Sequence, residues 1–482
     1  MTARSLTLGD LVDGGGNAAV TACAIDHRKV APGTIFGAFQ GARVNGEDYI
    51  DAAVTAGAVA VVARPEAKIT GALHIADANP RRAFAVLAAR VFAPFPATTV
   101  AITGTNGKTS TAELTRQLWQ LSGERAASIG TLGVTTGYDR VGQHEGTGGL
   151  TTPDIVTFLA TMAGLAREGI SHAAFEASSH GLDQYRTEGL PVTAAAFTNL
   201  SRDHLDYHGT MEAYFAAKSR LLRDVVNAGG TAVIWADDGD WSAQMIAVAR
   251  ARGLTLMTVG ETGETIKLIS RTSTALGQDL MVEIGGQRHV VRLPLIGDYQ
   301  AANALVAAGL VIACGGDAAR TLADLARVRG VRGRLERAVI TRTGAAVYVD
   351  YAHTPDAIRA ACAALRPHVT GRLILVLGAG GDRDAGKRPL MGEAAAAHAD
   401  VVIVTDDNPR SEDPASIRAA ILQAAPGAQD IADRRRAVAH AISMAVAGDI
   451  VLVAGKGHEQ GQTIGSQVLP FDDVTVAREC AA

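Results

Sequence analysis

One segment constrains the fold of this chain more than any other. Residues 98–103 form a short apolar and β-branched run, and Gly104, Gly107 and the pair Lys108-Thr109 follow at once. The run predicts a strand, the glycines predict a tight turn, and the residues from Lys108 onward have a helical pattern. A strand, a glycine turn and a helix in this order are typical of α/β proteins with a mainly parallel sheet.

The same turn is a candidate phosphate site. Glycines let backbone N–H groups approach phosphate oxygens, and the amino end of the following helix favours negative charge. Lys108 can reach the outer phosphates of a nucleotide, and the Thr109 hydroxyl can bind Mg²⁺. The common pattern has a glycine where this chain has Ile102, so an ordinary glycine turn before a helix is the alternative.

The chain is too long for one core, because single cores stop growing at about 250–300 residues. Short apolar runs fill the first block, and the prolines of residues 92–96 predict a linker. Strand and helix signals then alternate to about residue 330 and alternate again in a third block. We expect three α/β domains, with boundaries at 1–95, 96–330 and 331–482. The strands of the third block are expected at residues 346–350, 373–377, 401–405 and 450–454.

Composition excludes several classes of protein. Hydrophobic residues make up 48% of the 482, and the formal charge is −4, so a nucleic-acid backbone is not an expected partner. No apolar stretch reaches the roughly 20 residues that span a bilayer, and the amino end lacks a signal peptide. The four cysteines are scattered, which is typical of reduced thiols. We therefore expect a cytoplasmic protein without a membrane partner.

Three polar residues stand out because they lie at apolar segments. Glu176 ends one apolar run, and His204 follows another in the sequence Asp203-His204-Leu205. Lys218 lies on the apolar face of a helix expected over residues 211–222. A lysine on such a face needs a partner or a lowered pKa, unless it extends from the helix edge to solvent.

Residues 103–109 resemble the nucleotide loop of the Mur ligase family, which also includes folylpolyglutamate synthase. The resemblance implies an ATP- and Mg²⁺-dependent ligase that joins a carboxylate to an amine through an acyl phosphate. It implies an N-terminal uridine-nucleotide-binding domain, a central P-loop-type domain with a mainly parallel sheet, and a C-terminal Rossmann-like domain. The implied ATP-binding residues are Gly104, Thr105, Asn106, Gly107, Lys108, Thr109, Ser110, Asn303, Arg334, Asp350 and His353.

The resemblance also implies roles for the residues at the apolar segments. Thr109, Glu176 and His204 match magnesium ligands, and Lys218 matches a lysine that several members carry as a carbamate. A neutral lysine can add CO₂, and the resulting carbamate is a negatively charged ligand. Lys108, His204 and Lys218 are the expected catalytic residues.

Two further sets of segments resemble substrate sites of the family. Residues 151–153 and 178–186 match segments that bind UDP-N-acetylmuramoyl-L-alanyl-D-glutamate, and residues 25–33 match a uridine segment. The implied precursor-binding residues are Arg28, Thr151, Thr152, Ser178, Gln184 and Arg186. Residues 378–388, 407–410 and 454–459 match the pocket for meso-diaminopimelate. The implied residues of that pocket are Arg383, Asp407, Asn408, Pro409, Arg410, Gly455 and Glu459.

The charges of the last pocket agree with that amino acid. The far end of diaminopimelate carries an ammonium and a carboxylate, whereas lysine carries only the ammonium. Arg410 and Arg383 can bind the carboxylate, and Glu459 can accept from the ammonium. A lysine-adding or folate-type ligase remains the nearest alternative, and a nucleotide-binding regulatory protein without ligase activity is the more distant one. We expect a monomer.

Overall fold

The computed structural model describes residues 6–41, 44–137, 141–142, 151–274 and 277–482. The chain forms two compact units. The first unit consists of residues 1–266 and 306–321, and the second consists of residues 267–305 and 322–482. Helix α10 (Asp298–Ala313) begins in the second unit and ends in the first.

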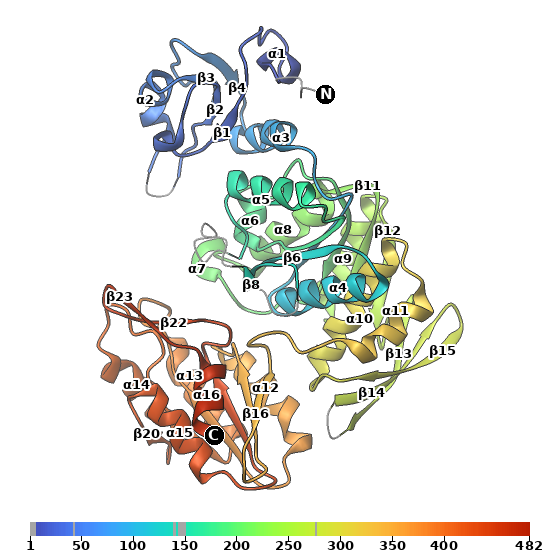
Figure 1. Ribbon diagram of the computed structural model, residues 1–482, viewed down its shortest axis with the longest axis vertical. Coiled ribbons are helices and arrows are strands. Elements are labelled where there is room, and N and C mark those ends of the chain that lie inside the picture. Colours follow the sequence, from blue (N-terminus) through green and yellow to red (C-terminus); the bar gives the residue numbers. More distant parts are fainter. Residues whose placement is uncertain (1–5, 42–43, 138–140, 143–150, 275–276) are drawn as a thin grey trace. The chain divides into compact units, whose positions relative to one another are not determined.

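The first unit begins with a small parallel sheet whose strand order is β1-β2-β3-β4. Successive residues of β2 point to opposite faces: Ile35 packs in a cluster with Phe84 of α3, and Phe36 packs with Ile50 of α2. The two helices therefore cover opposite faces of this sheet, as Figure 1 shows. The elements are α1 (Leu8–Leu11), β1 (Ala22–Ala24), β2 (Thr34–Gly37), α2 (Ile50–Thr55), β3 (Ala58–Ala63), β4 (Leu73–Ala76) and α3 (Pro80–Phe92).

The predicted linker follows α3, which ends at Phe92, and a second, larger sheet follows the linker. In the first unit its strand order is β12-β11-β10-β5-β9-β6-β7-β8, and the pairs from β12 to β6 are parallel. Its strands are β5 (Thr98–Thr103), β6 (Ala126–Gly130), β7 (Gly133–Thr135), β8 (Val141–Gly142), β9 (His172–Glu176), β10 (Val192–Phe197), β11 (Val226–Trp235) and β12 (Thr255–Gly260). Its helices are α4 (Lys108–Ser122), α5 (Ile155–Arg167), α6 (Ser179–Asp183), α7 (Leu205–His208), α8 (Met211–Arg220) and α9 (Asp240–Ala251).

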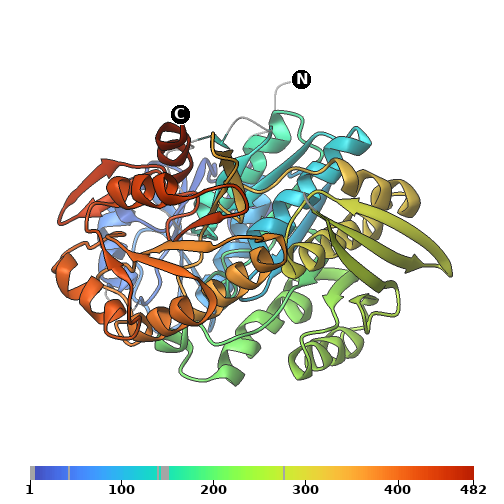
Figure 2. The same cartoon turned by 90° about the horizontal axis from the view of Figure 1, so that it is seen from below.

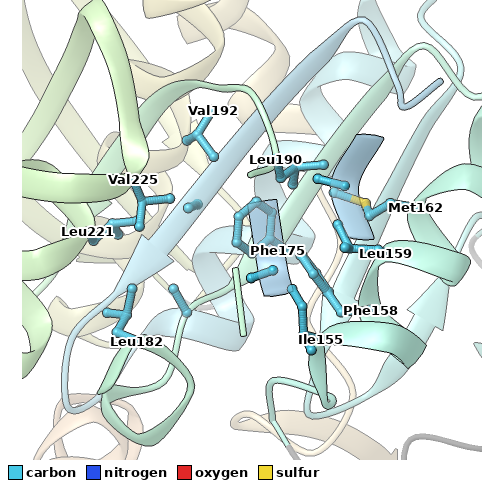
Figure 3. Close-up of a cluster of buried hydrophobic side chains, with 14 of the residues drawn as sticks. Ile155, Phe158, Leu159, Met162, Phe175, Leu182, Leu190, Val192, Leu221 and Val225 are labelled. Carbon is cyan, nitrogen blue, oxygen red and sulfur yellow. The ribbon is translucent and has the colours of Figure 1, made fainter. Parts of the chain in front are cut away.

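Strand β9 is held by one of the main apolar clusters. Phe175 lies at the centre of the cluster in Figure 3, and its ring meets that of Phe158 at 5.0 Å between centroids. Leu159 and Met162 of α5 and Leu190 pack around the same strand. Full burial of each such side chain contributes about 2 kcal/mol, so the end of β9 has a well-fixed position.

The second unit contains a six-stranded sheet of order β16-β17-β21-β18-β19-β20, parallel except for β16. Alternate residues of its strands face different cores, with Leu375 packed toward α12–α14 and Val376 toward α15 and α16. Helices cover both faces, which gives the predicted Rossmann-like arrangement. The elements are β16 (Glu336–Ile340), β17 (Ala346–Asp350), α12 (Pro355–Leu365), β18 (Leu373–Leu377), α13 (Lys387–His398), β19 (Val401–Val404), α14 (Pro414–Leu422), β20 (Gln429–Asp430), α15 (Arg434–Met444), β21 (Ile450–Ala454), β22 (Gly461–Ile464), β23 (Gln467–Pro470) and α16 (Asp473–Ala481).

The predicted alternation of strands and helices is wrong over one segment. β13 (Ile266–Thr274), β14 (Gly277–Ile284) and β15 (Gln287–Leu293) follow one another without a helix, and β14 and β15 form the long antiparallel hairpin drawn in olive in Figure 2. Gly285 and Gly286 both have positive φ angles, +57° and +76°, as the tightest hairpin turns require. The helix expected over residues 211–222 is also shorter, because α8 ends at Arg220 and a π-helical turn follows over Leu221–Val225. Within the described residues no helix is long and apolar enough to cross a membrane.

Candidate active site

The glycine turn between β5 and α4 adopts the geometry of a phosphate loop. Gly107 caps α4 with φ +85°, and Gly104 has φ +153°, which disfavours a side chain. A Cβ at Gly104 would lie 1.9 Å from Oγ1 of Thr198, so this backbone approaches its neighbour as only glycine permits. Lys108 Nζ donates to the carbonyls of Gly104 and Thr105, at 2.9 and 2.8 Å. The loop therefore places an ammonium beside the amino end of α4, where negative charge is favoured.

Lys218 also contacts this loop. Its side chain is 1% exposed, its Nζ donates to the carbonyl of Gly104 at 2.7 Å, and it lies 4.4 Å from the centroid of the Tyr214 ring. Burial, reinforced by the nearby charge of Lys108, holds the pKa of Lys218 well below its usual range. The buried orientation predicted for this lysine is thus confirmed, and the alternative of a side chain extending to solvent is wrong.

Glu176 and His204 lie at the ends of segments next to the loop. Glu176 ends β9 beside Ile102 of β5, and its carboxylate accepts from the backbone N–H and hydroxyl of Thr131, at 2.7 and 3.1 Å. His204 has φ +54°, and its Nε2 lies 3.4 Å from Asp203 Oδ2. Burial lowers the pKa of His204, which favours the neutral imidazole that can act as a ligand.

A magnesium ion fits these residues only as part of a mixed coordination shell. No group of three or more His, Cys, Asp or Glu side chains in the described ranges is arranged to hold a metal. Mg²⁺ commonly keeps several waters and takes one or two protein carboxylates together with substrate phosphates. Buried Glu176, oriented by Thr131 near the phosphate loop, is the kind of ligand that such a shell requires.

The residues predicted to bind the precursor come together around the end of β9, with one exception. Thr152 Oγ1 donates to the Glu176 carbonyl at 2.8 Å and accepts from Ser178 N at 3.0 Å. Arg186 donates to the Thr152 carbonyl at 2.8 Å and to Gln184 Oε1 at 2.7 Å. Thr151 joins the group through the Thr131 hydroxyl, at 3.3 Å. These contacts leave Arg186 hydrogen-bonded to neutral oxygens, so its charge can bind an anion.

Arg28 is the exception. It lies in the 3₁₀ turn His27–Lys29 near the first sheet, with 78% of its side chain exposed, and it forms a two-pronged ion pair with Asp26. Among the described residues, no hydrogen bond or ion pair links it to the other residues predicted to bind the precursor.

Four of the predicted ATP-binding residues belong to the second unit, and three of these four lie at the end of β17. The Arg334 guanidinium stacks over the Tyr351 ring at 4.6 Å, and Asp350 Oδ2 accepts from Leu335 N at 2.6 Å. His353 Nδ1 lies 2.8 Å from the Tyr351 carbonyl oxygen. Burial raises the pKa of Asp350 to about 6, although the Arg334 charge opposes this rise. Asn303 lies on α10 and is 4% exposed.

The predicted amino-acid pocket also lies in the second unit, at the ends of β19 and β21. Asn408 Nδ2 donates to Glu459 Oε2 at 2.7 Å, and Asp407 and Asn408 are 7% and 6% exposed. Arg410 has φ +52° and donates from Nη1 to the Gly381 carbonyl at 2.8 Å. A Cβ at Gly380 would lie 2.8 Å from Arg410 Nη1 and 3.9 Å from Arg383 Cγ, so both arginines border the same glycine.

Some residues of these sites were not foreseen from the sequence. Tyr214 contacts the phosphate loop through Thr105, with 3.3 Å between their oxygens, and its spacing of four from Lys218 was the available signal. Lys456 and Arg434 are fully buried beside Asp407. Lys456 lies within the predicted pocket segment 454–459, which gave this lysine no role of its own, and nothing in the local sequence of Arg434 indicates that it is buried.

Comparison with known families gives matches along most of the chain. Residues 19–94 match the Mur ligase family, catalytic domain; residues 102–311 match the Mur ligase middle domain; and residues 333–457 match the Mur ligase, glutamate ligase domain.

Individual proteins agree with these matches. A UDP-N-acetylmuramoyl-L-alanyl-D-glutamate--2,6-diaminopimelate ligase of Zymomonas mobilis is 60% identical over 95% of this chain and 93% of its own length. The enzyme of the same name from Bradyrhizobium diazoefficiens is 54% identical over 94% of this chain and 93% of its own. A solved structure of a ligase of that name is 32% identical and covers 99% of both chains, with a TM-score of 0.74. A MurF ligase from Thermotoga maritima in complex with ADP shares the fold, with a TM-score of 0.61 at 18% identity. This chain belongs to the Mur ligase family.

Proposed function

We propose that this protein is the ATP-dependent ligase that adds meso-diaminopimelate to UDP-N-acetylmuramoyl-L-alanyl-D-glutamate in peptidoglycan synthesis. The observation that carries the proposal is that one unit has a phosphate loop, while the other has an acid and two arginines in the loops that follow three neighbouring parallel strands, β21, β19 and β18. The relatives named for this activity, at 60% and 54% identity, support it.

The first unit supplies the groups that activate the carboxylate. ATP and the γ-carboxylate of the D-glutamate are both anions, so their reaction requires cations and oriented N–H groups between them. The backbone of residues 104–110 and the Lys108 ammonium bind the phosphates. Arg186, Thr151, Thr152, Ser178 and Gln184 orient the precursor, and Arg28 contacts its uridine end. Transfer of the γ-phosphoryl group to the carboxylate then gives the acyl phosphate.

Thr109, Glu176, His204 and carbamylated Lys218 would hold magnesium. When bound, the metal would neutralise negative charge on the phosphates during transfer of the γ-phosphoryl group. Lys218 contributes as a buried amine whose lowered pKa favours the neutral form that can add CO₂. As a carbamate it would place negative charge beside the Gly104 carbonyl, where a cation is then needed.

The second unit supplies the incoming amine. Asn303, Arg334, Asp350 and His353 are its proposed nucleotide-binding residues, and the Arg334 guanidinium lies 4.6 Å from the centroid of the Tyr351 ring. Arg410 and Arg383 bind the far carboxylate of diaminopimelate, and Glu459 with Asp407 accepts from its far ammonium. The amine at the near end attacks the acyl phosphate, an amide bond forms, and phosphate leaves.

The division into domains at residues 95/96 and 330/331 is part of this proposal, as is a monomeric, cytoplasmic enzyme. In this division, residues 1–95 bind the uridine end of the precursor, residues 96–330 carry the phosphate loop and the other precursor-binding residues, and residues 331–482 carry the amino-acid pocket and three of the ATP-binding residues.

The test is an amino-acid panel in an assay of ADP release. Purified protein receives ATP, Mg²⁺ and the muramoyl dipeptide, together with meso-diaminopimelate, L-lysine, L-glutamate or no amino acid. We expect release only with diaminopimelate, because no other amino acid of the panel brings both a carboxylate for Arg410 and Arg383 and an ammonium for Glu459 at its far end. If only lysine supports turnover, the lysine-adding alternative replaces the proposal. If no amino acid of the panel increases ADP release, the protein is not a ligase of this class.

A further inference from the structure

Lys456 is a fully buried lysine that the proposed reaction does not use. Its side chain is 0% exposed, and its Nζ donates to Asn408 Oδ1 at 2.9 Å and to Glu459 Oε2 at 3.2 Å. A third oxygen, Asp407 Oδ1, lies 4.0 Å away. Burial of an ammonium is costly unless several oxygens surround it, and here all three come from residues of the predicted amino-acid pocket.

The Asn408 amide is occupied by this arrangement. Its Oδ1 accepts from Lys456 and also from Thr463 N, at 2.9 Å each, and its Nδ2 donates to Glu459 Oε2 at 2.7 Å. Asn408 therefore links Lys456, Glu459 and strand β22. Its place in the pocket is better explained by this linking role than by contact with a ligand.

Glu459 is consequently held by one of its two oxygens. Oε2 accepts from both Asn408 and Lys456, whereas Oε1 makes no hydrogen bond within the part of the chain that the structure describes. The Glu459 side chain is 31% exposed, in contrast to the fully buried Lys456. Oε2 is thus held by Asn408 and Lys456, and Oε1 is available to a donor from solution.

Asp407 is similarly placed between two cations. Its oxygens lie 4.0 Å from Lys456 Nζ and 4.0 Å from Arg434 Nη1, and its side chain accepts no hydrogen bond from the described residues. Arg434 is itself held by buried Asp473, with bonds of 2.8 and 2.6 Å, while its Nη1 has no hydrogen-bond partner in the described chain. A Cβ at Gly455 would lie 2.5 Å from Asp407 Oδ2, so Gly455 leaves the space that this carboxylate fills.

The charges of this cluster do not cancel. With each group counted in its charged form, Asp407, Glu459 and Asp473 supply three negative charges, and Lys456 and Arg434 supply two positive charges. The remaining negative charge lies on the partly exposed side, because the Arg434–Asp473 pair is fully buried. A cluster of this kind suits a ligand ammonium, which would complete the charge balance.

We propose that Lys456 is a positioning residue for the amino-acid substrate. It fixes Asn408 and Glu459 so that a single carboxylate oxygen, together with Asp407, faces the far ammonium of the incoming diamino acid. Lys456 contacts no reacting atom and acts through Glu459. This inference rests on the proposed function, because it assigns the ammonium-binding part of the same pocket.

The test combines Lys456→Met with two amino acids. Diaminopimelate has the far ammonium, and 2-aminopimelate has the same chain and far carboxylate without it. Removal of Lys456 is expected to raise the KM for diaminopimelate by about tenfold or more, the usual effect of losing a hydrogen bond to a charged group. We expect kcat and the KM for ATP to stay within about threefold. The preference for diaminopimelate over 2-aminopimelate in kcat/KM should fall by about tenfold.

The controls separate positioning from folding. Lys456→Arg, which keeps the charge, should restore most of the preference, and Lys267→Met, at an exposed lysine of the same unit, should change nothing. Thermal unfolding is measured for each variant; if Lys456→Met does not fold, Lys456→Gln takes its place, and failure of both would make Lys456 purely structural and overturn the proposal. An unchanged preference in a folded variant would overturn it too. If wild-type protein shows no diaminopimelate-dependent turnover, the proposed function itself fails.

Discussion

In the proposed mechanism, magnesium binding depends on the buried amine of Lys218. Lys218→Ala would remove the proposed carbamate and its charge beside the phosphate loop, so we expect ATP turnover to fall by at least about a hundredfold. Millimolar acetate or bicarbonate should restore part of the activity, since a small carboxylate can occupy the space of the carbamate. ADP release with and without added acetate measures this effect.

The control for this experiment is an exposed lysine of the same unit. Lys68→Ala should keep full activity and gain nothing from acetate. If acetate and bicarbonate leave Lys218→Ala inactive while its thermal unfolding matches that of wild type, the carbamate assignment is wrong. The buried amine would then act only as a hydrogen-bond donor to the Gly104 carbonyl.

Asp350 gives a prediction about pH. Burial raises the pKa of its carboxyl from 3.8 to about 6, so the folded protein holds this proton more tightly than the unfolded chain does. The resulting stabilisation is fully present below about pH 4 and is lost as pH rises through about 6. It amounts to at most about 3 kcal/mol.

Asp350→Asn isolates this contribution. We expect the free energy of unfolding of wild type, relative to that of the variant, to fall from pH 4 to pH 6. This difference should stay constant from pH 7 to 8. Urea unfolding at each pH measures the difference. A difference that does not vary between pH 4 and pH 6 would show that the Asp350 pKa is not raised.

At the scale of elements, the adjacent strands β6 and β9 decide where Glu176 points. Gly130 ends β6, and a Cβ there would lie 2.0 Å from Glu176 Oε1. Gly130→Ala should therefore displace the carboxylate from Thr131 without disturbing the sheet. Because loss of a partner that orients a metal ligand commonly costs 10- to 100-fold in metal affinity, the Mg²⁺ concentration for half-maximal activity should rise by about tenfold.

Gly137 provides the matched control, because a Cβ at this glycine would meet no atom within 4 Å. Gly137→Ala should leave the Mg²⁺ dependence unchanged. The same dependence in wild type and Gly130→Ala would mean that Glu176 is not a ligand of the metal. A parallel loss of thermal stability would instead indicate general damage to the sheet.

At the scale of the whole molecule, the proposed precursor-binding residues and the proposed amino-acid-binding residues lie in different compact units. Hydrogen exchange can therefore locate each ligand. Diaminopimelate added to enzyme already saturated with a non-hydrolysable ATP analogue and precursor should slow exchange at residues 407–410 and 455–459 of the second unit. L-Lysine at the same concentration should give less protection. Peptides that cover residues 151–153 and 178–186 should show little further change, because the precursor already occupies their site.

Protection in the first unit instead of the second would contradict the proposed position of the amino-acid pocket. Protection by diaminopimelate confined to the first unit would remove Arg410 and Glu459 from the amino-acid site. Peptides from the hairpin of β14 and β15 serve as the internal control, since no residue of that hairpin is assigned to a substrate.

The sequence by itself determined the features that depend on neighbouring residues. The strand at 98–103, the glycine turn and the helix beginning at Lys108 follow from local propensity, and so do three of the four strands expected in the third block, at their exact bounds. The apolar face of α8 likewise indicated a buried Lys218, because helical spacing is a local property. The consecutive strands β13–β15 depart from the expected alternation of strands and helices, because the Gly285-Gly286 turn joins β14 directly to β15.

Only the tertiary structure decided which residues that are distant in the sequence form ion pairs or hydrogen bonds with one another. Lys456 and Arg434 could not be distinguished from exposed basic residues, because their burial depends on strands and helices that are far apart in the chain. The space that Gly130 leaves for Glu176 depends in the same way on the pairing of β6 with β9. Spacing along a chain encodes secondary structure, whereas the surroundings of a buried charge exist only after the sheet has assembled.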